Sequence, residues 1–275
     1  MDLRQRRDAY LEEGLSEALS NARACQDVFL LCLAKSEIHD YVTIKGGVVM
    51  QNLSGEKRRA TRDIDFDLIH YELSEKAVDR LFSKISNDYY GISRHGPSEE
   101  LHQQDYQGLR VHVRIADTSG FALEIKTDIG VHKYLDLMQE DCYFDVDAEE
   151  GKVSLLANSK EQIFTEKLKS LLNHGIRSTR YKDIYDLYYL CLIAGLDENK
   201  LSNCMKTLIF EAPNAKETSI HEVEERARRV LLNPAFFNRF RTAKNKWLDV
   251  DEQTVIEGIL GSLRKLETKA ESNEE

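Results

Sequence analysis

The chain has 275 residues, of which 41% are hydrophobic and 31% are charged, and its formal net charge at pH 7 is −10. These values indicate a globular protein of one large or two small domains, and they exclude a protein that coats nucleic acid non-specifically, which needs excess positive charge. No apolar run approaches the roughly 20 residues of a membrane span, and the charged N-terminus lacks the apolar segment of a signal peptide. We therefore expect a cytoplasmic protein that does not contact a membrane.

Residues 3–35 predict two helices, because apolar side chains recur there every three or four positions. The pattern then changes to a short β-branched run over 41–47, which ends in the glycine pair Gly46-Gly47 and precedes a segment that can begin a helix. In the stretch that follows, up to residue 157, the helical period of apolar residues predicts a helix over 74–88. Alternating apolar and polar residues predict strands over 62–69, 109–115, 121–129 and 142–146.

The remainder of the chain, from Ser159 onward, has helical periodicity only. Ser159 can cap a helix that ends at Gly175, and a second helical pattern ends at Gly195. Three further helices are expected near 197–210, 216–232 and 252–268. The sequence therefore predicts an α+β fold, with a mixed part over residues 1–157 and a helical part over residues 158–275.

Any metal ion is expected to be held by carboxylates. The five cysteines include no CxxC pair, and the eight histidines form no HxxxH or HExxH pattern. The cysteines therefore indicate buried thiols in a reducing compartment, whereas oxygen ligands would select hard ions such as Mg²⁺ or Mn²⁺.

The strand expected over 62–69 alternates between acidic and apolar side chains. Alternate residues share one face of a strand, so the apolar side chains can face a core while Asp63, Asp65 and Asp67 crowd the opposite face. Like charges this close repel one another unless a cation neutralises them, which favours a metal site. The alternative is a solvated strand face.

The strand expected over 121–129 can supply a further ligand. Its alternation puts Lys126 and Asp128 on the face opposite to its apolar residues. If the two strands are neighbours, Asp128 reaches Asp63 and Asp65. Three carboxylates can bridge two divalent ions roughly 3.5–4 Å apart, an arrangement that stabilises in-line phosphoryl displacement. An ordinary surface position is the alternative for Asp128.

Two segments beside the acidic strand are suited to bind an anion. Gly46 and Gly47, preceded by Lys45, allow the backbone to approach a phosphate at the start of a helix, where negative charge is favoured. Arg62 is the last of four cations over 57–62. The alternatives are an ordinary turn and a solvated loop.

The helical part contains a lysine at a position that the helical pattern predicts to be buried. Lys167 lies on the apolar stripe between Ile163 and Leu171, where an ammonium is rarely placed without a partner. Asp183 on the next helix can be that partner. The pair has two interpretations: a purely structural ion pair, or a lysine that contacts a triphosphate and is oriented by Asp183.

Taken in order, these motifs resemble those of the AbiE-type toxin nucleotidyltransferases, the toxin half of type IV toxin–antitoxin and abortive-infection systems. The resemblance covers roughly residues 40–190 and rests on Gly46-Gly47, Asp63-Ile64-Asp65, Lys126-Thr127-Asp128, Lys167 and the segment 180–183. It implies a DNA polymerase β-like mixed sheet with flanking helices, followed by a helical bundle that completes the active-site cleft.

The resemblance also implies roles for the residues that match its motifs. Asp63, Asp65 and Asp128 would bind the metal ions. Lys167 and Asp183 would be catalytic together with these three acids. The nucleotide-binding residues would be Lys45, Gly46, Gly47, Arg62, Lys126 and Arg180. The chain departs from the family in having Val48 after the glycine pair, where a hydroxyl residue is usual, and this departure bears on the choice of nucleotide.

The function implied is transfer of a nucleoside monophosphate from an NTP to an RNA, with the 3′ end of tRNA as the expected acceptor, growth arrest as the effect and an antitoxin as partner. Two alternatives remain: a small-molecule nucleotidyltransferase of the antibiotic-modifying kind, which the net negative charge favours, and a non-catalytic module that only binds nucleotide. The helical part could supply a basic RNA-binding surface, unless it is a solvated face. Its candidates are Arg177, Arg180, Lys182, Arg226, Arg228, Arg229, Arg239, Arg241, Lys244 and Lys246.

Overall fold

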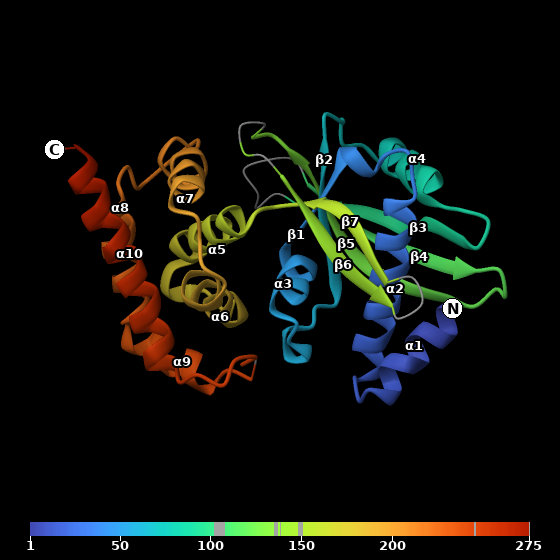
Figure 1. Cartoon of the computed structure of the whole chain (residues 1–275), viewed down its shortest axis with the longest axis horizontal. Helices are drawn as coiled ribbons and strands as arrows, with labels where there is room; N and C mark the ends of the chain where they lie inside the picture. Colours follow the sequence, from blue (N-terminus) through green and yellow to red (C-terminus); the bar gives the residue numbers. More distant parts are fainter. Residues whose placement is uncertain (102–107, 135–136, 138, 148–150, 245, 275) are drawn as a thin grey trace. The chain divides into compact units, whose positions relative to one another are not determined.

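A mixed sheet organises the N-terminal part of the chain (Figure 1). The structure is a computed structural model that describes residues 1–101, 108–134, 137, 139–147, 151–244 and 246–274. The chain divides into two units, Met1–Asn158 and Ser159–Glu275. The α+β class expected from the sequence is confirmed, since the strands of the described residues lie in the first unit and the second is helical.

The sheet has the order β3-β4-β5-β2-β1-β7-β6. The pairs β2–β5 and β1–β7 are parallel, and the other neighbouring strands are antiparallel. The strands are β1 (Val42–Lys45), β2 (Asp63–Ile69), β3 (Tyr90–Glu100), β4 (Leu109–Asp117), β5 (Ala122–His132), β6 (Glu140–Asp147) and β7 (Gly151–Ala157).

The helices of the first unit are α1 (Leu3–Glu12), α2 (Glu17–Ala34), α3 (Gly46–Ser54) and α4 (Glu75–Ile85), of which α2 and α4 cover the apolar side of the sheet. The long helix α2 is buried over most of its length and packs against β3, β5, β6 and β7, while α4 packs against β3 (Figure 1). Phe29 of α2 stacks on Phe66 of β2 with ring centroids 5.4 Å apart. The alternate side chains of β2 therefore point away from α2.

Two strands, β3 and β7, were not expected. The β3 sequence contains Gly96 and Pro97, which usually indicate a turn. Here Gly96 adopts a φ of +77°, and the register with β4 shifts between His95 and Glu99, so a bulge accommodates both residues within the strand. Such a bulge interrupts the regular alternation by which a strand is identified in a sequence.

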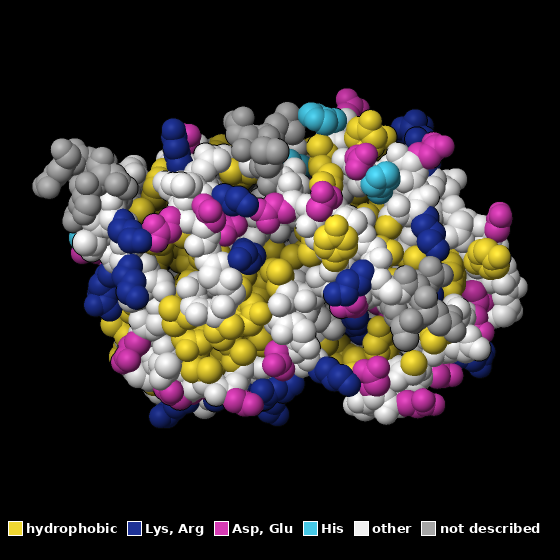
Figure 2. Space-filling model, viewed as in Figure 1, with side chains coloured by type: hydrophobic (Ala, Val, Ile, Leu, Met, Phe, Trp, Pro, Cys, Tyr) yellow, Lys and Arg dark blue, Asp and Glu magenta, His cyan; other side chains and the backbone are white. Residues whose placement is uncertain are grey.

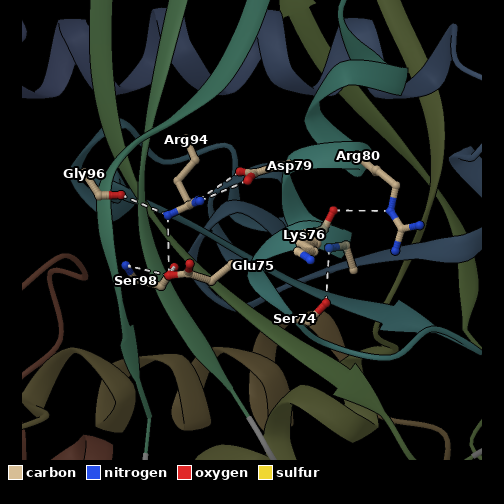
Figure 3. Close-up of polar contacts among 9 residues, drawn as sticks. Ser74, Glu75, Lys76, Asp79, Arg80, Arg94, Gly96 and Ser98 are labelled. Atoms are coloured by element: carbon tan, nitrogen blue, oxygen red, sulfur yellow. Dashed lines mark hydrogen bonds and ion pairs between the residues drawn. The ribbon is translucent and has the colours of Figure 1, made fainter.

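Side-chain contacts to α4 hold the bulged half of β3 in place (Figure 3). The Arg94 guanidinium donates to both carboxylate oxygens of Asp79, at 2.8 and 2.9 Å, and to the carbonyl of Gly96 at 3.1 Å. The Ser98 hydroxyl donates to Glu75 at 2.7 Å. Arg94 therefore points to the helical side of the sheet, which leaves its neighbours Ser93 and His95 on the opposite side.

The second unit is built from α5 (Lys160–His174), α6 (Tyr181–Tyr188), α7 (Glu198–Met205), α8 (Ile220–Leu231), α9 (Pro234–Thr242) and α10 (Glu252–Glu274). The helix α6 continues as a π-helical segment, η4 (Tyr189–Ala194). As expected, Ser159 caps α5 by accepting from the backbone of Gln162, and Gly175 is its C-cap. The helix α9 was not expected, and Asn233 caps it ahead of a proline at its first position. None of the helices described is long and apolar enough to cross a membrane.

Candidate active site

The acidic residues of β2 and β5 share one face of two adjacent strands. The parallel register places Asp65 opposite Asp128 and Asp63 opposite Lys126. Between the acids of β2, Ile64 and Phe66 are fully buried. Their burial on the helical side is the reason that the carboxylates gather on the other side, because successive side chains alternate across a strand.

Cationic side chains from the neighbouring strands are paired with these carboxylates. Lys126 Nζ lies 3.1 Å from Asp63 Oδ2. The guanidinium of Arg110 donates two hydrogen bonds of 2.8 Å to the two oxygens of Asp128, and this hydrogen bonding raises the pKa of Arg110 above its ordinary value. Arg110 was not a candidate in the sequence analysis. It lies on β4 in register with Asp128, and its only signal was its place in an alternating strand.

The carboxylates nevertheless suit a hard divalent ion. No group of three or more His, Cys, Asp or Glu side chains in the described residues is placed so that it could hold a metal ion. The Lys126–Asp63 pair is open, with side chains 34% and 36% exposed, and a pair this open contributes about 0–1 kcal/mol, whereas Arg110 holds both oxygens of Asp128, which is 20% exposed. Oxygen donors from carboxylates are the ligands that Mg²⁺ prefers, so an ion that binds here must replace these two cations.

The glycine pair lies directly against the acidic strand. Gly46 has a φ of +67°, and a Cβ at this position would lie 2.2 Å from Asp65 Oδ2. At Gly47 a Cβ would lie 2.5 Å from the Thr61 hydroxyl. Only residues without side chains allow the start of α3 to approach the carboxylate this closely, so the space that glycine leaves is part of the site.

A buried amide holds the start of β2. The Gln26 side chain, on α2, donates to the backbone carbonyls of Thr61 and Asp63 at 3.1 and 3.2 Å. This residue was not identified from the sequence.

The other two basic candidates, Lys45 and Arg62, differ in position. Lys45 is almost buried and lies 2.6 Å from Asp67, whereas Arg62 is exposed one residue before β2.

In the second unit, Lys167 is buried among carboxylates. Its Nζ lies 2.6 Å from Asp183 Oδ1 and 2.8 Å from Asp186 Oδ2, and Arg180 Nε lies 2.5 Å from Asp183 Oδ2. Burial raises the pKa of Asp183, but the charges of Lys167 and Arg180 outweigh burial and hold that pKa well below its ordinary value. Asp186, fully buried, was missed, although it follows Asp183 by three residues and therefore lies on the same helix face.

Several of the basic residues expected to form an RNA surface on the helical unit are engaged with acids or other polar groups. Arg239 donates to the Tyr181 hydroxyl and to the backbone carbonyl of Ile176. Figure 2 shows positive and negative side chains interspersed over the face in view. Among the candidates, ion pairs join Arg180 with Asp183, Arg226 with Glu217, Arg228 with Glu224 and Lys246 with Glu252.

A family model described as the nucleotidyl transferase AbiEii toxin of type IV toxin–antitoxin systems matches residues 28–257. The match includes the acidic strands, the glycine pair and the Lys167 cluster. No curated protein matches the chain.

Proposed function

Because the chain belongs to the AbiEii family of nucleotidyl transferase toxins, we propose that it transfers a nucleoside monophosphate from an NTP to an RNA in a reaction that requires Mg²⁺ or Mn²⁺. The proposed acceptor is the 3′ end of tRNA, and the proposed effect is growth arrest that a cognate antitoxin relieves. The observation that carries the metal-dependent reaction is the parallel pairing of β2 with β5, which sets Asp65 beside Asp128.

In this proposal Asp63, Asp65 and Asp128 hold the metal ions. The ions, when bound, neutralise the triphosphate and lower the pKa of the attacking hydroxyl. Asp128 also accepts the proton of that hydroxyl as its oxygen attacks the α-phosphorus. The bond from the α-phosphorus to the bridging oxygen breaks, and pyrophosphate leaves with the bonding electron pair.

Several groups of the first unit are suited to hold the triphosphate. The start of α3 presents backbone N–H groups and the positive end of the helix dipole, and Gly46 and Gly47 leave room beside it. Lys126 can exchange Asp63 for a phosphate oxygen, since both side chains are partly exposed. Arg62 is exposed at the start of the same strand and can add a further contact.

We propose further that Lys167, Asp183 and Arg180 of the helical unit take part in the reaction. Lys167 would offset the negative charge that develops on the leaving pyrophosphate, and Asp183 would orient the lysine. The ion pair of Lys167 with Asp183 supports this arrangement, as does the side chain of Arg180, which is 60% exposed and can reach a phosphate while it contacts Asp183. A purely structural role is the competing interpretation, and a kinetic comparison of Lys167→Met with wild type at a temperature where both are folded separates the two.

The test is an incubation of purified protein with Mg²⁺, each α-³²P-labelled NTP in turn, and total RNA. We expect label on one size class of RNA with wild type and with Asp40→Asn, a control at a side chain that is 74% exposed, and none with Asp65→Asn. Equal labelling by Asp65→Asn would refute the assignment of the acids. Label on an added aminoglycoside but on no RNA would favour the small-molecule alternative, which the net charge of −10 supports.

A further inference from the structure

One face of the strands β3, β4 and β5 carries basic and imidazole side chains. Along β4, Leu109, Val111, Val113 and Ile115 are buried on the side where α2 and α4 pack. The residues between them, Arg110, His112 and Arg114, point to the other side, and the last two are exposed. One face of an antiparallel sheet can be solvated and polar, and the three polar positions of β4 on this face are all arginine or histidine.

The register extends this row onto the neighbouring strands. His112 lies opposite His95 on β3 and opposite Lys126 on β5, and Arg114 lies opposite Ser93 and Glu124. At the other end of the row, Arg110 lies opposite Asp128. We call the set His95, Arg110, His112, Arg114 and Lys126 the basic face. It runs from the edge of the sheet to the proposed metal-binding acids.

The charge of the basic face is opposite to that of the whole chain. Its three cations and two histidines are accompanied by two acids beyond the metal-binding positions: Glu99, which lies opposite Arg110, and Glu124, which lies 3.5 Å from His95. The chain as a whole carries a net charge of −10. A local excess of positive charge on an acidic protein is complementary to a polyanion and is well placed to guide one to a single point.

We propose that the basic face binds the single-stranded 3′ end of the RNA acceptor and leads it to Asp128. This inference rests on the proposed function, which it deepens by naming the surface that takes the acceptor. Single-stranded RNA suits an open sheet face better than a duplex does, because unstacked bases can lie on imidazole rings and guanidinium planes while phosphates pair with the cations. Arg114 is the most informative residue, since it is exposed and lies four residues from the proposed site along β4.

The test measures binding of a 5′-fluorescein-labelled 12-nucleotide single-stranded RNA to the full-length protein by fluorescence anisotropy, without NTP. We expect Arg114→Glu to raise the Kd about tenfold, because reversal of the charge replaces an attraction by a repulsion. Arg114→Gln should reduce the slope of log K against log salt concentration by about 0.7, which corresponds to one phosphate contact on a single strand. Thermal melts establish that each variant is folded.

The matched control is Arg80→Glu. Arg80 is an exposed arginine on α4, in the helical layer on the opposite side of the sheet, where it donates to the backbone carbonyl of Lys76 (Figure 3). The control changes net charge by the same amount, so it should leave the Kd within about twofold of wild type at physiological salt, where charges more than about 8 Å apart are screened.

The outcomes separate this inference from the proposed reaction. If wild type transfers no nucleotide to RNA but Arg114→Glu still weakens RNA binding while Arg80→Glu does not, the reaction is wrong and the binding face stands. If wild type transfers nucleotide and the two variants bind RNA equally well, the basic face is not the acceptor surface. A loss in Arg114→Glu of antitoxin binding alone, with RNA binding intact, would also overturn the inference and make the face a protein interface.

Discussion

The glycine that faces the acidic strand allows a sharp test of the site. At Gly46 a Cβ would lie 2.2 Å from Asp65 Oδ2, so in Gly46→Ala the carboxylate must move by about 1 Å to restore an ordinary contact. Alanine at a φ of +67° also costs about 1–2 kcal/mol of backbone strain. A displacement of about 1 Å in a group that aligns the reaction lowers the rate about 100-fold.

A second glycine separates the displacement from the strain. Gly55 ends α3 with a φ of +64°, and a Cβ there would meet nothing within 4 Å. In urea denaturation, Gly55→Ala should therefore lose the stability that corresponds to the backbone strain, but it should transfer nucleotide to total RNA at the wild-type rate. Gly46→Ala should lose both stability and transfer rate. If Gly46→Ala is folded and transfers nucleotide as fast as Gly55→Ala, the position of the Asp65 carboxylate does not govern the reaction.

Three further results are expected. Lys167→Met leaves two buried carboxylates without their ammonium and should lower the free energy of unfolding, measured in urea, by about 3–5 kcal/mol. The control Lys265→Met, at an exposed position, should change this free energy by less than about 0.5 kcal/mol. Equal effects of the two variants would contradict the buried cluster. The pKa of Asp183 is lower in the folded than in the unfolded chain, so its contribution to stability is complete above about pH 4 and is lost as the pH falls below that value. The Tm of wild type should therefore fall more steeply than that of Asp183→Asn between about pH 4 and 2. Parallel curves of Tm against pH would refute this. Burial raises the pKa of Cys25 to about 12, so iodoacetamide at pH 8 should modify it only after denaturation, as peptide mass spectrometry would show; rapid modification of the native protein would disprove its burial.

Local alternation predicted which face of each strand carries the acids. Ile64 between Asp63 and Asp65, and Thr127 and Ile129 on either side of Asp128, are buried, and this pattern is visible in the sequence. The order of strands is not local information. Arg110 was missed for this reason, because nothing near it in the chain indicates that β4 lies beside β5 and brings it to Asp128.

Other residues were missed because their partners are distant or their element is irregular. The hydrogen bonds of Gln26 reach backbone carbonyls 35 and 37 residues away, and a buried glutamine on an apolar helix gives no indication of where its amide points. The bulge in β3 interrupts the alternation by which that strand could have been predicted. Asp186 could have been found, since the i, i+3 spacing from Asp183 places both carboxylates toward the same neighbouring helix.

Under the proposed function, the parallel pairing of β2 and β5 also sets the point of synthesis at which the site can be complete. Asp63 and Asp128 are 65 residues apart, and the chain between them includes a helix and two strands of the sheet. Closure of so long a loop is entropically costly and slow. In the proposed reaction, a nascent polypeptide that has not yet reached Asp128 holds only two of the three carboxylates, so we expect half-made copies on a ribosome to be inactive until synthesis and folding are complete.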